Sequence, residues 1–425
     1  MKSLDVGIVG GGTAGTAAGL LLARTGHRVT LYERIPDPGP VGAGIVLQPT
    51  GQTVLQRLGL LSEILERGAR IDELRVVHGD GRGIFSLDYS PLGPGHFGLG
   101  LHRGVLFQTL LEAAREQEGL EVRCGVDIVD LHDDADDVSL ETAEGERLGP
   151  HDMVVIADGA RSVLRQASGL PFEEHPYEWG ALWFIAEDPE QVYSGELLQI
   201  LRGTRRMLGL LPTGRGPEPD SPHQVSLFWS LPASTLRAFR EGDLDAWKRM
   251  VLADEPRAGL VLDQLHDVQQ LVFAQYRRVS MPRWHGQRAV FLGDAAHAMS
   301  PQLGQGCNLA LVDAAVLADV VSTASSPRVA VHEYTRERKA HLRYYQLATW
   351  GLTPLFQSDH DWLGWFRDRL MPLATKIPWM RQQMCSSMSG HMQGVFRAPM
   401  PLSRLAGEAE AAALPEGGAE PSPRQ

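Results

Sequence analysis

The sequence contains little lysine, little cysteine and no long apolar run near its start. Only four of its 40 basic residues are lysines. Its three cysteines, Cys124, Cys307 and Cys385, are odd in number and widely spaced. They predict neither a disulfide framework nor a zinc site, so we expect no metal centre and a reducing, cytoplasmic environment.

These absences also limit the classes of partner. The longest apolar run near the N-terminus covers residues 17–23, which is far below the ~20 residues that span a bilayer. The pattern of a signal peptide is not found there. The net charge of −12 argues against a phosphate-backbone partner. We therefore expect a globular protein with no nucleic-acid partner and no stable membrane insertion.

The first positive signal is a β-α-β pattern in residues 4–33. An apolar strand over 4–9 leads into a glycine loop at 10–15, a helix follows to residue 25, and a second strand is closed by Glu33. The loop matches G-x-G-x-x-G, in which the glycines allow a tight turn, close approach of a pyrophosphate, and packing of helix on strand. Glu33 would accept hydrogen bonds from the ribose hydroxyls of an adenosine. The context predicts dinucleotide binding.

A second stretch, residues 288–318, combines a short buried strand, an acidic turn, a glycine loop and a helix. Asp294 at the strand tip can accept hydrogen bonds from ligand hydroxyls. Gly304 and Gly306 let the backbone approach a flat ligand, and the helix start offers free N–H groups and a positive dipole end. The alternative is a structural Gly-Asp turn before a helix.

Three further segments are ambiguous when read alone. Asp158-Gly159 follows a buried strand over 153–157 and is either a ligand turn or a capped helix start. Residues 42–49 are flexible and then extended, so they lie beside a cofactor or form an ordinary crossover. Arg103 occupies the first turn of a predicted helix, and the local sequence favours a surface salt bridge there over an anionic ligand.

The remaining chain changes character twice. Residues 175–279 read as a strand-rich region, in which Trp179, Trp183 and Trp229 are candidates to line a substrate pocket, with plain core as the alternative. Tryptophan-rich helices over 346–402 would cap a pocket or form a partner surface. A membrane-surface role is a further option for them, although their basic face is thin. Residues 403–425 are expected to be a disordered tail.

The three motifs together, Gly10–Gly15 with Glu33, Asp158-Gly159, and Gly293-Asp294 with Pro301, resemble the class A flavoprotein monooxygenases of the para-hydroxybenzoate hydroxylase type. The resemblance covers roughly residues 4–347. It implies an α/β fold, α+β overall, with a discontinuous Rossmann-like FAD domain (1–72, 99–174 and 280–345). A mixed-sheet substrate domain (73–98 and 175–279) and C-terminal helices would complete the molecule.

The same resemblance implies roles for individual residues. Arg103 would approach the FAD pyrophosphate, Ile128 would meet the adenine, and Asp294 would bind the ribityl chain. Cys307 falls where relatives carry assorted small residues, so we interpret it as filler. The full set of expected cofactor-binding residues is Gly10, Gly12, Thr13, Ala14, Gly15, Glu33, Arg34, Val46, Arg103, Ile128, Asp158, Asp294, Pro301, Gly304, Gln305, Gly306, Cys307 and Asn308.

The activity implied is hydroxylation of a small aromatic or other electron-rich substrate. NADH or NADPH would reduce FAD transiently, and O2 would form a flavin C4a-hydroperoxide that donates one oxygen atom. No catalytic base is identifiable, and the protein would be a monomer or homodimer. A reductase or oxidase of the same fold is the alternative. A halogenase is disfavoured, because no lysine occurs between Lys2 and Lys248.

Overall fold

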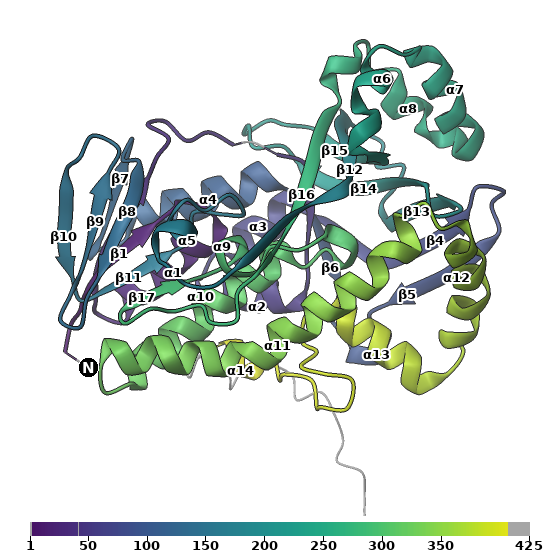
Figure 1. Ribbon diagram of the computed structural model, residues 1–425. Coiled ribbons are helices and arrows are strands. Elements are labelled where there is room, and N and C mark those ends of the chain that lie inside the picture. The colour runs from purple at the N-terminus through teal and green to yellow at the C-terminus, as the bar shows by residue number, and fades with distance from the viewer. Residues whose placement is uncertain (1, 41, 407–425) are drawn as a thin grey trace, which may run out of the picture.

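A computed structural model describes residues 2–40 and 42–406 of the chain (Figure 1). Its centre is a five-stranded sheet in the order β17-β11-β1-β2-β7, in which every pairing is parallel. Helices cover both faces, so the central strands are almost continuously apolar. The strands are β1 (Asp5–Val9), β2 (Arg28–Glu33), β7 (Leu120–Cys124), β11 (Met153–Ile156) and β17 (Ala289–Phe291).

Three long helices pack on this sheet or on one another. α1 (Thr13–Arg24) contacts both α4 (Arg103–Glu116) and α10 (Gly306–Thr323). By length and composition α10 would suit a membrane span, but 72% of it is buried inside the protein. Its apolar side chains belong to the core instead, including Leu311, Val312 and Leu317.

A nine-stranded mixed sheet forms the other large layer and lies beside the first in Figure 1. Its order is β16-β12-β15-β14-β13-β4-β6-β3, with β5 paired to β4, and only β13 and β4 run parallel. A separate antiparallel sheet contains β8 (Ile128–Asp133), β9 (Val138–Thr142) and β10 (Arg147–His151). The strands of the mixed sheet are β3 (Gly44–Leu47), β4 (Ala69–His78), β5 (Gly83–Asp88), β6 (Gly98–His102), β12 (Glu173–Glu187), β13 (Gly195–Arg202), β14 (Arg206–Arg215), β15 (His223–Pro232) and β16 (Val272–Ser280).

The remaining helices cover the edges of these layers. Residues 49–67 form two helices and not one, because Gly59 adopts φ +65° and ends the first. The tail expected from residue 403 begins instead with α14, whose Leu405 is buried, and residues 407–425 lie outside the described part. These helices are α2 (Pro49–Arg57), α3 (Leu61–Arg67), α5 (Leu164–Ala167), α6 (Leu236–Arg240), α7 (Leu244–Asp254), α8 (Gly259–Leu262), α9 (Asp294–His297), α11 (Pro327–Phe356), α12 (Asp361–Ala374), α13 (Pro378–Met388) and α14 (Ser403–Ala406).

The expected α/β architecture is confirmed, and its topology explains where a site forms. β17, β11 and β1 are adjacent and parallel, so the turns that follow them meet at one edge of the sheet. Those turns carry Gly10, Asp158 and Asp294. Three motifs separated by more than 130 residues of sequence therefore share one edge, the position at which parallel α/β sheets bind ligands.

Candidate functional site

The three turns contact one another directly. A Cβ atom added at Gly10 would lie 2.4 Å from the carbonyl oxygen of Ala157, immediately before Asp158. A Cβ added at Gly293 would lie 3.0 Å from the Cβ of Ala14. The first and last motifs therefore pack against each other without intervening side chains, and only small residues fit between them.

The glycine loop assigns a different task to each glycine. Gly10 has φ +106°, which requires glycine, and a Cβ on Gly15 would lie 2.0 Å from the Gly10 carbonyl oxygen. A Cβ on Gly12, in contrast, would meet nothing within 4 Å. Gly12 is also the N-cap of α1 and provides no side-chain cap. The start of α1 is thus open and presents its N–H groups, as an anion site requires.

Glu33 lies beside this loop at the end of β2. Its Oε2 accepts a hydrogen bond from the Gly11 amide at 2.8 Å, and its Oε1 accepts one from the Ile35 amide at 2.9 Å. The Glu33 carbonyl accepts from Val126 at 3.0 Å, which places the approach to β8 and Ile128 next to it. Arg34 is exposed at the same corner. The expected adenosine residues are therefore brought together.

Arg103 does not form the salt bridge that its local sequence favoured. It is exposed at the first position of α4, and no carboxylate of the described residues lies within ion-pair distance of it. The helix is capped instead by His102, whose Nδ1 accepts from the Gly104 amide at 3.0 Å. The aliphatic part of Arg103 packs on Gly42, so its guanidinium is available to an anion.

Asp294 is exposed at the start of α9, and a buried network below it fixes the turn. The Gly293 amide donates to Asp313 Oδ2 at 2.8 Å, and His297 Nε2 lies 2.6 Å from the same oxygen. Arg338 Nε donates to Asp313 Oδ1 at 2.7 Å. Burial alone would raise the pKa of Asp313, but the charges of His297 and Arg338 hold that pKa well below its usual range. Sequence reasoning missed this residue, although an aspartate within the apolar run of α10 was a signal.

The loop Gly304–Asn308 is joined to β3 through one side chain. The Asn308 amide group donates to Val46 O at 3.0 Å and to Gly304 O at 3.1 Å, and its Oδ1 accepts from the Gln48 amide at 2.8 Å. Asn308 therefore positions the loop with its side chain and leaves only its backbone N–H for a ligand. Gly304 adopts φ +61°, and Cβ atoms at Gly304 and Gly306 would meet nothing within 4 Å.

The segment after α13, which lies within the residues 346–402 expected to cap a pocket or form a partner surface, also contacts this loop. Gln305 Nε2 donates to Met388 O at 2.6 Å, and Thr50 Oγ1 donates to Ser389 O at 3.2 Å. His341 Nε2 lies 2.7 Å from Gly390 O. His391 is buried here, and burial, helped by the nearby His96, lowers its pKa to about 4. The C-terminal segment is therefore part of the wall of the candidate site.

Asp158 points its carboxylate into a buried position. Both of its oxygens are buried and lack a hydrogen-bond partner among the described residues. Burial raises the pKa of Asp158. The neighbouring Arg165 is fully buried and donates to Ala295 O at 2.7 Å and to Glu174 Oε2 at 2.5 Å. Arg165 thereby ties the Asp158 turn to α9, while the Asp158 carboxylate still lacks a donor.

Cys307 fills space between the loop and β3. Its thiol contacts Val46 O at 3.7 Å, and burial raises its pKa to about 12. A thiol with such a pKa stays protonated and unreactive near neutrality. Pro301 starts a short 3-10 turn, residues 301–303, that leads into the Gly304 loop.

The three tryptophans expected to line a substrate pocket do not share one surface. Across β12 and β15, Leu182 is paired with Trp229 and Trp183 with Phe228, so Trp229 and Trp183 point to opposite faces of the sheet. Trp229 packs against Trp247 of α7, with ring centroids 5.7 Å apart. It belongs to the core under α6–α8, and its assignment to the pocket was wrong. Trp179 is buried and has the same parity along β12 as Trp183.

Trp183 lies in an apolar cluster that adjoins the Gly304–Asn308 loop through Val46. It packs on Phe228 with ring centroids 5.0 Å apart, and Val46 belongs to the same cluster. The Trp183 indole donates to the Tyr276 hydroxyl at 3.1 Å. Burial raises the pKa of Tyr276 to about 12, so its hydroxyl stays protonated. This cluster is therefore the apolar surface that adjoins β3 and, through Val46, Asn308.

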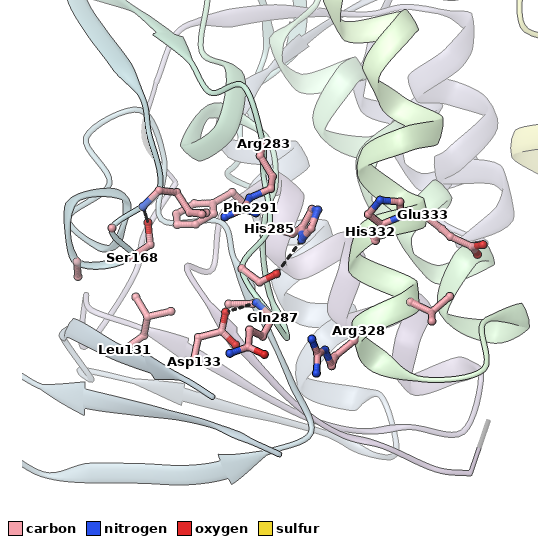
Figure 2. Close-up of a pocket in the computed structure, with 16 residues that line it drawn as sticks. Leu131, Asp133, Ser168, Arg283, His285, Gln287, Phe291, Arg328, His332 and Glu333 are labelled. Carbon is pink, nitrogen blue, oxygen red and sulfur yellow. Dashed lines mark hydrogen bonds between the residues drawn. The ribbon is translucent and has the colours of Figure 1, made fainter. Parts of the chain in front are cut away.

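A separate cavity of about 720 Å³ lies elsewhere, between β8, β17 and the first half of α11. Figure 2 shows Arg283, His285 and Phe291 along one side and Arg328 and His332 on the other. None of the residues predicted to bind the cofactor lines it. It is distinct from the edge of the sheet at which the three turns meet.

Comparison with known proteins agrees with the motifs. Residues 3–345 match the family model described as an FAD binding domain. The chain is 28% identical to 2-heptyl-3-hydroxy-4(1H)-quinolone synthase of Pseudomonas aeruginosa over 88% of this chain and 96% of that protein. It is 30% identical to 6-methylpretetramide 4-monooxygenase of Streptomyces rimosus over 73% of each. The structure of Klebsiella pneumoniae HpxO with FAD and uric acid superposes with a TM-score of 0.77 at 20% identity, over 91% of this chain and 97% of that one.

Proposed function

Because the chain belongs to the FAD-dependent aromatic monooxygenases, we propose that it uses NADH or NADPH and O2 to hydroxylate a small aromatic or other electron-rich substrate. The observation that carries the proposal is the meeting of the Gly10, Asp158 and Asp294 turns at one edge of the parallel sheet. We propose that residues 1–72, 99–174 and 280–345 hold FAD. Residues 73–98 and 175–279 would contact the substrate.

The residues present fit this cofactor. The open start of α1 and Arg103 would hold the pyrophosphate, Glu33 the adenosine ribose and Asp294 the ribityl hydroxyls. The space above Gly12, Gly304 and Gly306 admits backbone contact with a flat ring. When bound, FAD supplies the two-electron and oxygen chemistry that no amino acid side chain provides.

The chain's own residues would position the ring and exclude water. Asn308 fixes the Gly304 loop on β3, so the backbone N–H groups at the start of α10 point in a fixed direction. Such donors at a helix start favour negative charge on the group that faces them. The Asp313 network holds Gly293 and therefore Asp294 in place.

The substrate side favours an uncharged, largely apolar ring. The cluster next to Val46 contains Trp183, Phe228 and Leu211, and its nearby polar groups are hydroxyls such as Tyr276. Two relatives are named for a heptyl quinolone and a pretetramide, which are fused-ring compounds. We propose that this chain also accepts a fused or alkylated aromatic ring.

The first experiment is a visible spectrum of the purified protein, followed by aerobic NADH and NADPH oxidation with a panel of phenols, quinolones and aromatic acids. A flavin spectrum, substrate-stimulated oxidation and incorporation of one atom of 18O from 18O2 into product are expected. A colourless protein that does not bind added FAD contradicts the proposal. Stimulated oxidation without 18O in the product would assign a reductase or oxidase of the same fold.

A further inference from the structure

The helix α12 reverses the usual arrangement of an amphipathic helix, because it buries an arginine and exposes aromatic and aliphatic side chains. Its buried residues are Gly364, Arg367 and Ala374. Arg367 is almost fully buried and donates to Gly203 O at 3.0 Å and Leu355 O at 2.8 Å. The exposed side carries Trp362 and Trp365, which are 66% and 60% accessible, with Phe366, Leu370 and Leu373. A helix of a globular protein normally turns such residues toward the core.

Neighbouring helices extend this apolar surface. α12 packs on α11 and lies on the side of the molecule away from the parallel sheet, and α13 follows it toward the middle of the molecule (Figure 1). Trp350 on α11 is 61% accessible and Trp379 on α13 is 52% accessible. Four of the chain's nine tryptophans are therefore exposed on three consecutive helices. An exposed aromatic group of this size marks an interaction surface.

Charge identifies the kind of partner. Residues 327–406 contain 11 arginines and lysines against five aspartates and glutamates, whereas residues 1–326 contain 28 against 43. The C-terminal helices are thus basic in a chain whose net charge is −12. Most of this excess lies on α11, which has five basic against two acidic residues, whereas α12 has two of each and α13 has one arginine and no acidic residue.

Most acidic groups of this region are already neutralised. Arg205 lies 3.6 Å from Asp359 and 3.4 Å from Asp361, and Arg367 lies 2.7 Å from Asp368. Several exposed cations instead have no carboxylate within 4 Å in the described part of the chain, namely Lys339, Arg343, Arg369 and Lys376. Arg369 lies over the ring of Trp365 at 3.9 Å. At this position an exposed aromatic side chain and an exposed cation are in contact on the surface.

We propose that α12, α13 and the second half of α11 form a docking surface for an anionic phospholipid bilayer. Tryptophan side chains prefer the boundary between headgroups and acyl chains, and flanking arginine and lysine side chains bind lipid phosphates. The surface projects from the molecule, and neither of the two cavities identified lies on it. Residues 407–425 contain one leucine and no aromatic residue, so their sequence offers little apolar surface to match the exposed tryptophans. The surface adsorbs to the bilayer without spanning it, and this inference does not depend on the proposed reaction.

The test measures co-sedimentation of the full chain with sucrose-loaded vesicles. Its tryptophan fluorescence is also recorded with and without the vesicles. Binding to vesicles containing phosphatidylglycerol is expected, with a blue shift of emission. The double variant Trp362→Ser/Trp365→Ser should bind at least about tenfold more weakly. Arg369→Ala/Lys376→Ala should lose about fivefold per cation on anionic vesicles, and 0.5 M salt should reproduce that loss.

A matched control is Leu252→Ser/Val272→Ser, which removes two exposed apolar side chains at the opposite side of the mixed sheet region. It should bind vesicles like the unmodified protein. Since all these side chains are exposed, thermal unfolding should be unchanged in every variant. Absence of vesicle binding, or equal binding by the Trp362→Ser/Trp365→Ser variant, overturns the proposal. A concentration-dependent dimer that this variant dissociates, without vesicle binding, would assign the surface to a second copy instead.

Discussion

Asn308 donates its side-chain amide to the carbonyl of Val46, and 262 residues separate the two in sequence. The Oδ1 atom of the same side chain accepts from the backbone N–H of Gln48. One carboxamide therefore joins the start of α10 to the end of β3 through both its donor and its acceptor. Val46 in turn belongs to the apolar cluster of Trp183 and Phe228. The proposed flavin loop and the proposed substrate surface are therefore held together by one residue.

Replacing Asn308 by Leu should loosen that connection. The buried backbone N–H of Gln48 would lose its acceptor, and an unsatisfied buried group costs about 1–3 kcal/mol. We expect a loss of unfolding free energy of that size and at least a tenfold weaker FAD affinity, measured by denaturant titration and by flavin fluorescence. Asn308→Asp keeps the acceptor for Gln48 but turns a buried carboxylate toward the carbonyl oxygens of Val46 and Gly304, so its loss should be at least as large. Unchanged affinity in Asn308→Leu would contradict the positioning role.

Two glycines of the loop 10–15 should affect different properties when substituted, one the stability of the fold and the other the affinity for FAD. In Gly15→Ala the new Cβ would lie 2.0 Å from a backbone oxygen, so the protein without FAD should be strongly destabilised. In Gly12→Ala the Cβ meets open space, so the thermal midpoint without FAD should be unchanged. That space is the one proposed for the pyrophosphate, and FAD affinity should fall at least about tenfold. Equal FAD affinities for Gly12→Ala and the unmodified protein would place the pyrophosphate elsewhere.

Trp183 and Trp229 should respond differently to substitution because they face opposite sides of one sheet. Trp229→Ala removes a ring from the core under α7 and should cost about 3–5 kcal/mol of stability, with substrate preference retained in the folded fraction. Trp183→Phe should keep stability within about 1.5 kcal/mol but change KM values across the aromatic panel. Chemical denaturation and steady-state kinetics of both variants are the measurements. A shift of substrate preference in the Trp229 variant alone would reverse this assignment.

Stability should depend on pH through His391. Its pKa falls from an ordinary value near 6.5 to about 4 in the folded protein, chiefly through burial. The unfolded chain therefore binds a proton first as pH falls, so stability is full above about pH 6.5 and is progressively lost down to about pH 4. The loss for this group is on the order of 3 kcal/mol. Denaturation of His391→Gln at pH 4.5 and 7.5 should show a smaller pH dependence than the unmodified protein, and an identical dependence would exclude His391 as the cause.

Reactivity of the thiols tests the interpretation of Cys307 as filler. With a pKa raised to about 12, it should resist a thiol-selective disulfide reagent at pH 8 in the native protein. Cys385 is buried with a pKa raised to about 11 and should also resist, which leaves Cys124 as the thiol that reacts. Cys307→Ala should bind FAD within about twofold of the unmodified protein, because packing alone is changed. Rapid labelling of Cys307, shown by peptide mapping, would contradict this.

Much of the architecture follows from short segments of the sequence. The β-α-β unit at 4–33 has its glycine loop, helix and acidic residue within about 30 residues, so local spacing alone defines the turn, the helix start and the position of Glu33. The Asp158 and Gly293-Asp294 turns likewise each follow an apolar strand. The resemblance assigned these turns to one discontinuous domain, and the structure adds that their strands are parallel neighbours, so the turns lie at one edge of the sheet.

The tertiary structure decided what local spacing cannot express. Both faces of β12 and β15 are apolar, so alternation shows that two faces exist but not which one adjoins the flavin loop, and Trp229 was assigned to the wrong one. The partners of Asn308 and Asp313 lie on elements distant in sequence, so no pattern within α10 identifies them. The exposure of Trp362 depends on Arg367 turning inward to the carbonyl groups of Gly203 and Leu355. The sequence by itself determined the β-α-β unit and the turns that follow its apolar strands, because local spacing defines them, and the folded chain determined which side of each element meets core or solvent, because that depends on contacts between distant segments.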